Sequence, residues 1–263
     1  MVSLIVAGMV LLAASGAPQA ASGGTIPGGI IAGVSFGVPP LPGGGGSSCS
    51  WRLANPHDAH LGRGGEVSRV LDGLRYWLYE RRCDERDDLV WVPEMTPERL
   101  AEQASQQVRR WVPEPPVSTA PPADRAVVHV PMWFWTGREF WQPVEATAWV
   151  PHGDGVLWAT ARAEPSLMWF DPGDGALGHG PVSCRGPGPE WTAADGDHGV
   201  SPCSVTYRHA STSTAAGAYN ALVRVIWTTS WHASDGSGGE LDPLTSTAAV
   251  PIRVHEIHAL VSR

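Results

Sequence analysis

Alternation of apolar and polar residues dominates the second half of the chain. In the run 218–233, Val223, Val225, Trp227 and Trp231 fall on one face, and Arg224, Thr228 and Ser230 fall on the other. This period of two is typical of a half-buried antiparallel strand. Further apolar runs, separated by Gly, Asp and Pro turns, are 127–135, 143–150, 156–163, 166–171, 204–209 and 245–261. About seven such strands predict a β-sandwich.

A smaller unit of mixed type precedes these strands. Two apolar runs, 74–83 and 89–94, flank the charged segment DERDD, and this arrangement predicts a β-hairpin. Residues 67–78 also carry apolar side chains at helical spacing, so a helix there is an open alternative.

A helix is predicted directly after the hairpin. Thr96 can cap it, Pro97 suits the first helical turn, and Arg109 and Arg110 suit its C-terminal end. We expect its apolar face to pack on the hairpin. That face consists of Leu100, Ala104, Val108 and Trp111.

The N-terminal part reads as an export signal followed by a tether. Residues 1–22 contain a short apolar stretch and then small residues, as in a secretory signal peptide; an uncleaved N-terminal anchor is the alternative. Residues 23–48 are rich in Gly, Pro and Ser and predict a flexible linker. The remaining organisation is a small α+β unit at 49–113, a proline-rich connector at 114–126 and a sandwich domain at 127–263.

Four cysteines fit a secreted or otherwise extracytoplasmic protein, because disulfides persist in oxidising compartments. Four cysteines allow three pairings. We expect the sequential pairing, Cys49 with Cys83 and Cys184 with Cys203, because each pair then lies within one unit. A zinc site is disfavoured because the sequence has no Cys-x-x-Cys.

Composition and charge exclude several classes of protein. All 18 basic residues are arginine, so chemistry that needs lysine, such as a phosphate-loop lysine or a Schiff base, is excluded. The net charge is −8, and residues 114–263 hold 15 acidic residues against 8 arginines. No basic footprint for nucleic acid is present, and no phosphate loop for a nucleotide. Any membrane contact is expected only through the N-terminal segment.

Three pieces of the C-terminal half resemble the PKD (polycystic kidney disease) domain pattern. They are WFDPGDG at 169–175, SPCSVTYRHAS at 201–211 and GAYNALVRVIW at 217–227. The resemblance implies an Ig-like antiparallel sandwich. Residues 49–262 also resemble a group of exported actinobacterial proteins that share VPMWFW-type, CRGPGPEW…SPC and RVHEIHAL-type segments, and this group implies no particular activity.

The acidic turn after residue 170 is the first candidate site. Asp171, Gly173, Asp174 and Gly175 fit a structural turn, in which Asp and Gly satisfy local backbone geometry. A weak calcium site is an open alternative, although the further oxygen ligands of a calcium loop are absent. The histidine pairs HDAH at 57–60 and HEIH at 255–258 lack the spacing of the helical zinc motif. We therefore expect no catalytic residues, no metal and no cofactor.

An aromatic cluster is the second candidate site. Adjacent aromatic residues on one strand cannot all face the same core, so the cluster is expected to pack between domains or to form a binding surface. The cluster is Trp133, Phe134, Trp135 and Trp141.

Together these observations predict an exported, non-catalytic protein of the cell envelope or extracellular space that binds a protein or glycan partner. Two alternatives stay open: a secreted hydrolase or glycan-active accessory protein, and a structural component of a surface assembly. The pattern Gly-x-Ser-x-Gly at 33–37 resembles a hydrolase motif, but that motif needs a preceding strand and a following helix, and here Gly and Pro flank it.

Overall fold

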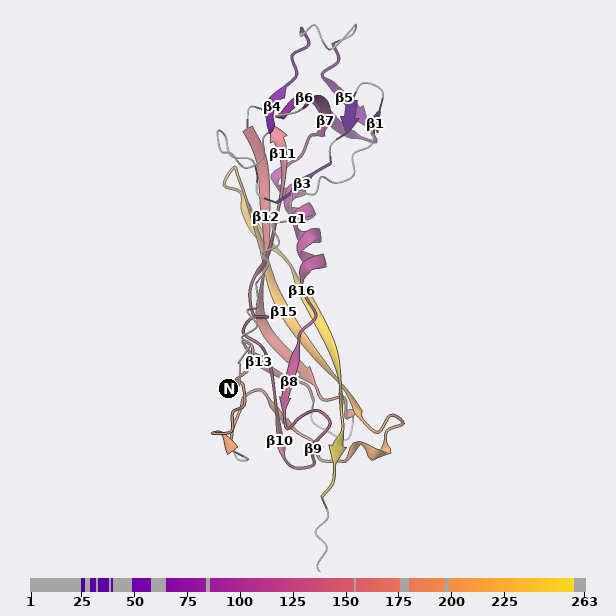
Figure 1. Ribbon diagram of the computed structural model, residues 1–263, viewed down its shortest axis with the longest axis vertical. Coiled ribbons are helices and arrows are strands. Elements are labelled where there is room, and N and C mark those ends of the chain that lie inside the picture. Colours follow the sequence, from indigo (N-terminus) through magenta and orange to yellow (C-terminus); the bar gives the residue numbers. More distant parts are fainter. Residues whose placement is uncertain are drawn as a thin grey trace, which may run out of the picture. The chain divides into compact units, whose positions relative to one another are not determined.

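The computed structural model describes residues 25–26, 29–31, 33–37, 39, 49–57, 65–83, 86–153, 155–175, 180–196 and 199–257. The fold is mainly β, with largely antiparallel sheets and, in the described residues, one α-helix (Figure 1). The predicted mainly-β class is therefore confirmed. The predicted signal segment 1–22 lies outside the described residues.

The chain divides into two compact units. Unit 1 comprises the residues up to Thr96 together with Thr147–Trp158, and unit 2 comprises Pro97–Ala146 and Ala159–Arg263. The division differs from the predicted boundaries, because the helix belongs to unit 2 and because two long strands carry the chain from one unit to the other.

Unit 1 contains the predicted hairpin. Its strands are β1 (Thr25–Ile26), β2 (Gly29–Ile31), β3 (Ser35–Phe36), β4 (Cys49–Leu53), β5 (Ser68–Leu71), β6 (Leu74–Cys83) and β7 (Arg86–Pro93). β6 pairs with β7, as expected, and also with β4 and β5. The helix considered for 67–78 is wrong. Asp72 and Gly73 have φ of 50° and 77°, the geometry of a tight hairpin turn, so this segment folds as β5 and β6 instead.

The segment predicted as a linker contributes strands to unit 1. β2 pairs in parallel with β7, and β3 pairs with β11 at Ala148 and Trp149. The expectation of a tether over 23–48 is wrong for these positions. Backbone pairing needs little side-chain volume, so a segment poor in large side chains can still complete a sheet.

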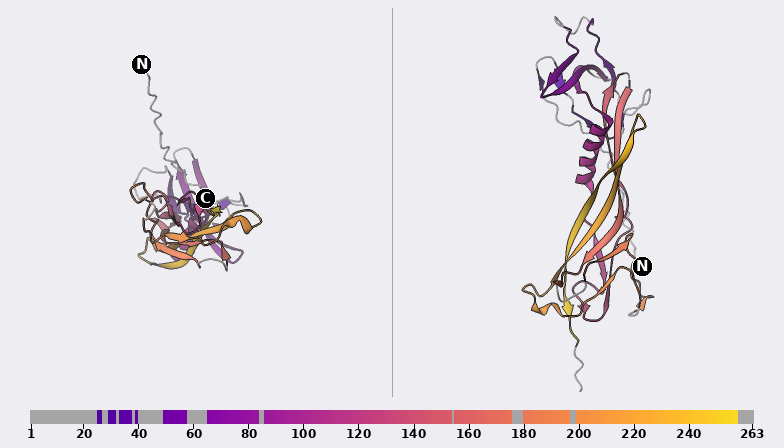
Figure 2. Two further views of the ribbon diagram at one scale, coloured as in Figure 1. Left: turned by 90° about the horizontal axis from the view of Figure 1, so that it is seen from below. Right: turned by 180° about the vertical axis from the view of Figure 1, so that it is seen from behind.

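Unit 2 contains the helix and most of the long strands. Its elements, including the two strands that begin or end in unit 1, are α1 (Pro97–Trp111), β8 (Val117–Ala120), β9 (Ala126–Val127), β10 (Pro131–Thr136), β11 (Val144–His152), β12 (Gly155–Asp171), β13 (Val182–Arg185), β14 (Ser204–Thr206), a 3-10 turn at Ser211–Ser213, β15 (Tyr219–Ala233), β16 (Gly238–Ile252) and β17 (Val254–His255). β15 and β16 form a long twisted hairpin beside β12 (Figures 1 and 2).

Several predicted strands in unit 2 have different limits. The runs 156–163 and 166–171 form one strand, β12, in which Pro165 is accommodated at an irregularity in the pairing with β15. The run 127–135 is divided between β9 and β10, with His129 at φ 65° between them. The expected alternation in β15 is present at Val223, Val225 and Trp227, which are buried, whereas Trp231 on the same face is only partly buried.

The core of unit 2 is built on aromatic pairs and on the helix. Phe134 stacks on Phe170 with ring centroids 4.3 Å apart, and Phe140 and Trp227 pack in a T-shaped arrangement. α1 lies against β15 through its apolar face, where Leu100, Ala101, Ala104 and Val108 are buried. The predicted apolar face thus contacts a strand of its own unit, and Trp111, assigned to the same face, is half exposed.

Candidate binding pocket

Both predicted disulfides are present. Cys49 is bonded to Cys83 across β4 and β6, and Cys184 is bonded to Cys203. The second disulfide closes a segment of irregular structure that carries Trp191. Disulfides are typical of proteins in oxidising, extracytoplasmic compartments.

The segment closed by Cys184 and Cys203 forms one wall of a pocket. The pocket has a volume of about 240 Å³. Its other walls come from the end of β8 and the start of β10, two strands that pair with each other. The lining residues are Ala120, Pro121, Pro122, Val130, Pro131, Trp133, Trp191, Gly196 and Gly199. We call this the Trp133–Trp191 pocket.

Local hydrogen bonds hold the Trp191 wall in place. The indole N–H of Trp191 donates to the carbonyl of Gly196 at 3.3 Å. The backbone N–H and the hydroxyl of Thr192 both donate to Asp195 Oδ2, each at 2.7 Å. Both hydrogen bonds lower the pKa of Asp195, and the bond from the hydroxyl has the larger effect. The carboxylate is therefore charged at neutral pH.

A glycine sets the distance between this wall and the strand β10. A Cβ atom at Gly199 would lie 2.9 Å from Cζ2 of Trp133 and 3.1 Å from the carbonyl oxygen of Asp195. Only glycine therefore permits this approach without a shift. The next residue, Val200, is 92% exposed, so a large apolar side chain stands in solvent immediately after this wall.

The structure separates the four predicted aromatic residues. Trp133 lines the pocket, although only 6% of its surface is exposed. Phe134 is fully buried against Phe170, so of the two alternatives for the cluster this residue follows the one in which it packs. Trp135 and Trp141 are partly buried and do not line this pocket.

The acidic turn is organised by its own backbone. Asp171 Oδ1 accepts a hydrogen bond from the backbone N–H of Gly173 at 3.0 Å, an Asx turn. Gly173 and Gly175 have φ of 75° and 62°, which glycine adopts readily. Within the described part of the chain, no three His, Cys, Asp or Glu side chains come together as they would around a metal ion.

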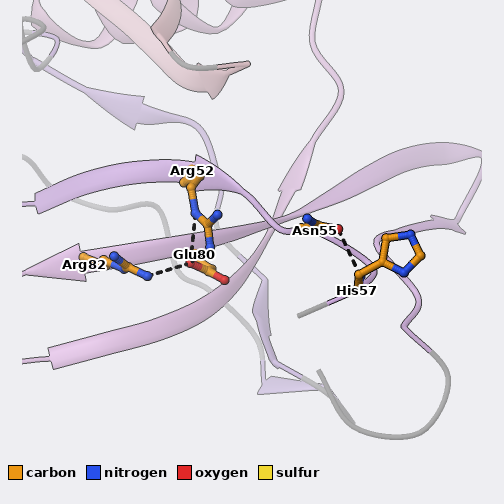
Figure 3. Close-up of polar contacts among 5 residues, drawn as sticks. All are labelled: Arg52, Asn55, His57, Glu80 and Arg82. Atoms are coloured by element: carbon orange, nitrogen blue, oxygen red, sulfur yellow. Dashed lines mark hydrogen bonds and ion pairs between the residues drawn. The ribbon is translucent and has the colours of Figure 1, made fainter. Parts of the chain in front are cut away.

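The histidine pairs and the hydrolase-like pattern are not assembled into a site by the described residues. His57 is exposed, and its backbone N–H donates to Asn55 (Figure 3). His255 contacts the carbonyl of Asp124 at 3.0 Å. Ser35 lies in β3, paired with Trp149, rather than on a strand-to-helix turn. His60 and His258 lie outside the described residues.

Unit 1 carries a separate cluster of charged side chains. Glu80 is almost completely buried, and its Oε2 accepts from Arg52 at 2.9 Å and from Arg82 at 3.3 Å (Figure 3). Arg81 pairs with Asp88 at 2.6 Å on the neighbouring strand. These ion pairs link β6 to β4 and to β7, and each carboxylate of the cluster has an arginine partner.

Sequence reasoning missed Trp191. The sequence feature that could have indicated it is a tryptophan in a Gly- and Pro-rich segment between two cysteines that were expected to pair. Such a segment cannot bury a tryptophan within itself, so its indole must pack on a neighbouring element.

No model of a known protein family, no curated protein and no solved structure matches this chain. In the described residues, no helix is both long and apolar enough to cross a bilayer.

Proposed function

We propose that this chain is an exported, non-catalytic binding protein that recognises a protein partner through the Trp133–Trp191 pocket. The observation that carries the proposal is the chemistry of the lining, which consists of apolar side chains, prolines and glycines around two indoles. Recognition of a glycan needs several directed hydrogen bonds from side chains. Here one indole N–H is already bonded to Gly196, so an apolar group of a protein fits better than a sugar.

The size of the pocket limits what enters it. Ligand pockets for drug-sized molecules usually measure ~300–1,000 Å³, and this one is smaller, at about 240 Å³. It suits one small apolar group, such as a proline ring or an aliphatic side chain of the partner. Charged Asp195 beside the wall favours a basic residue next to that group.

Three features support export and a binding role. The two disulfides fit an oxidising compartment. The apolar N-terminal segment reads as a signal peptide or an anchor. The resemblance of 169–175, 201–211 and 217–227 to PKD domains fits a sandwich domain that works outside the cytoplasm.

The experiment is a selection for peptides that need the pocket. A library of random twelve-residue peptides displayed on phage is selected on the purified protein, and the enriched peptides are tested on Trp191→Ala. We expect enriched sequences with a proline or aliphatic residue beside a basic one, whose binding falls at least tenfold on the variant. Trp111→Ala is the matched control, because Trp111 is half exposed and outside the pocket.

Two results would contradict the proposal. One is equal binding of the selected peptides to the wild type and to Trp191→Ala. The other is turnover of a generic ester or oligosaccharide by the wild type that Trp191→Ala leaves unchanged, which would favour the hydrolase alternative and another site.

A further inference from the structure

β16 is an edge strand in unit 2. It pairs with β15 alone among the described strands, and no described residue forms a backbone hydrogen bond with its other edge. Pro243 and Pro251 interrupt this edge, but residues 244–250 between them contain no proline. An unpaired edge of this length presents N–H and C=O groups on which another extended chain can pair.

A groove follows this edge. It has a volume of about 500 Å³, and five consecutive residues of β16, 243–247, form one side of it. Side chains of consecutive residues in a strand point to opposite faces of the sheet. Because five consecutive residues all line the groove, the groove borders the edge of the strand and not one of its faces. The opposite side consists of Arg109, Val112 and Glu114.

The segment opposite β16 is poorly equipped to complete the sheet. Pro113, Pro115 and Pro116 have no N–H to donate. The N–H of Val112 is already bonded to the carbonyl of Val108. The groove is thus bordered by a pairing-competent edge and by a neighbouring segment in which only Glu114 keeps a backbone N–H that could donate to it.

A second hollow continues along α1. Its volume is about 430 Å³, and it shares Arg109 with the first groove. On its far side, Trp231 lies opposite Gly239 in the β15–β16 pairing, so no side chain from that position covers the indole. An extended chain along the groove would therefore meet an aromatic ring at one end.

The charge of the two hollows favours a basic ligand. Four carboxylates and one guanidinium, that of Arg109, line them. Within the described residues, none of the four carboxylates has an ion pair. They belong to Glu98, Glu102, Glu114 and Asp242.

We propose that an extended, basic segment of a partner protein binds in this groove and adds a strand to the free edge of β16. Main-chain hydrogen bonds to residues 244–247 would supply the affinity, and the carboxylates would select lysine or arginine side chains. This site shares no lining residue with the Trp133–Trp191 pocket, so a result that contradicts one proposal leaves the other untouched.

The test uses the full chain and a panel of nine-residue peptides in which lysine alternates with valine, threonine or leucine. Binding is measured by calorimetry, and the bound position by hydrogen–deuterium exchange. We expect slower exchange of the amides of residues 244–247. We also expect no binding by the same peptides N-methylated at alternate residues, because methylation removes the donors that a strand needs. Asp242→Asn and Glu114→Gln should each weaken binding about two- to fivefold, and Glu240→Gln, on the same strand but outside both hollows, should not.

Four outcomes would overturn the proposal. They are equal binding of the N-methylated peptides, no binding by any peptide of the panel, protection of residues 244–247 by cellohexaose instead of by peptides, and protection that rises with protein concentration alone. The third would assign the groove to a glycan, and the fourth to a second copy of this chain.

Discussion

The hydroxyl of Tyr207 donates a 3.1 Å hydrogen bond to the carbonyl of Pro172, within the acidic turn that follows β12. The ring of Tyr207 also stacks on the ring of Tyr219, with centroids 5.4 Å apart and planes 4° from parallel. The hydroxyl of Tyr219 in turn donates to the carbonyls of His209 and Ala210. Two stacked tyrosines therefore anchor two separate loops of unit 2.

Replacing Tyr207 by phenylalanine should lower the free energy of unfolding by about 1–3 kcal/mol, because the buried carbonyl of Pro172 loses its donor. Tyr219→Phe is the matched control. Its loss should be smaller, because the carbonyl acceptors of Tyr219 belong to less buried residues that water can reach. Urea denaturation measures the free energy of unfolding of both variants. Equal losses would show that the hydrogen bond to Pro172 stabilises the fold no more than the bonds of Tyr219 do.

Stability should fall in alkaline solution. Burial raises the pKa of Tyr207, and the nearby negative charge of Asp174 adds a smaller increase. Burial also raises the pKa of Tyr219. A phenol whose pKa is higher in the folded chain stabilises the fold fully below its unfolded pKa of about 10. That contribution is lost as the pH rises above this value. The chain has no lysine to titrate in the same range, so tyrosine dominates the effect.

The measurement is the free energy of unfolding at a series of pH values from about 8 to about 11.5. The wild type should lose stability above about pH 10, and Tyr207→Phe should lose less over the same range. Parallel curves for the two proteins would contradict the assignment of the effect to Tyr207.

Two glycines of the acidic turn offer a matched pair of substitutions. Gly175→Ala should cost about 1–2 kcal/mol, because φ is 62° and no described atom lies within 4 Å of an added Cβ. Gly173→Ala should cost about 1–3 kcal/mol more, because its Cβ would also collide with the carbonyl of Asn220. Thermal and urea denaturation compare the two variants. Equal costs would mean that Asn220 moves aside freely.

Alternation along single strands was enough to predict the fold class and most strands of unit 2. Val223, Val225 and Trp227 are buried as their spacing indicated, because one face of β15 meets the core. The pairing of the cysteines was also predictable, since each sequential pair lies within one predicted unit. What alternation could not show was which element the helix would meet. The face of Leu100 and Val108 fits any apolar surface, and only the tertiary structure selects β15.

Other features depended on backbone geometry that the pattern did not reveal. The apolar spacing of residues 67–78 fits a helix, but the tight turn at Asp72 and Gly73 divides this segment into two paired strands. The Trp133–Trp191 pocket joins residues 58 positions apart, brought together by pairing of β10 with β14 and by the disulfide to Cys203. Such a pairing cannot be read from periodicity, because it depends on contacts between elements rather than within one.

The two disulfides should differ in their reaction with an added thiol. Cys49 and Cys83 are partly exposed, whereas Cys184 and Cys203 are 5% and 0% exposed. A thiolate must reach a sulfur atom directly to exchange with it, so brief treatment with dithiothreitol should open the Cys49–Cys83 bond first. Alkylation followed by peptide mass spectrometry should then label Cys49 and Cys83 alone, and denaturant should be needed to label the other pair. Simultaneous labelling of all four cysteines in the native protein would show that the segment closed by Cys184 and Cys203 opens far more readily than its burial implies.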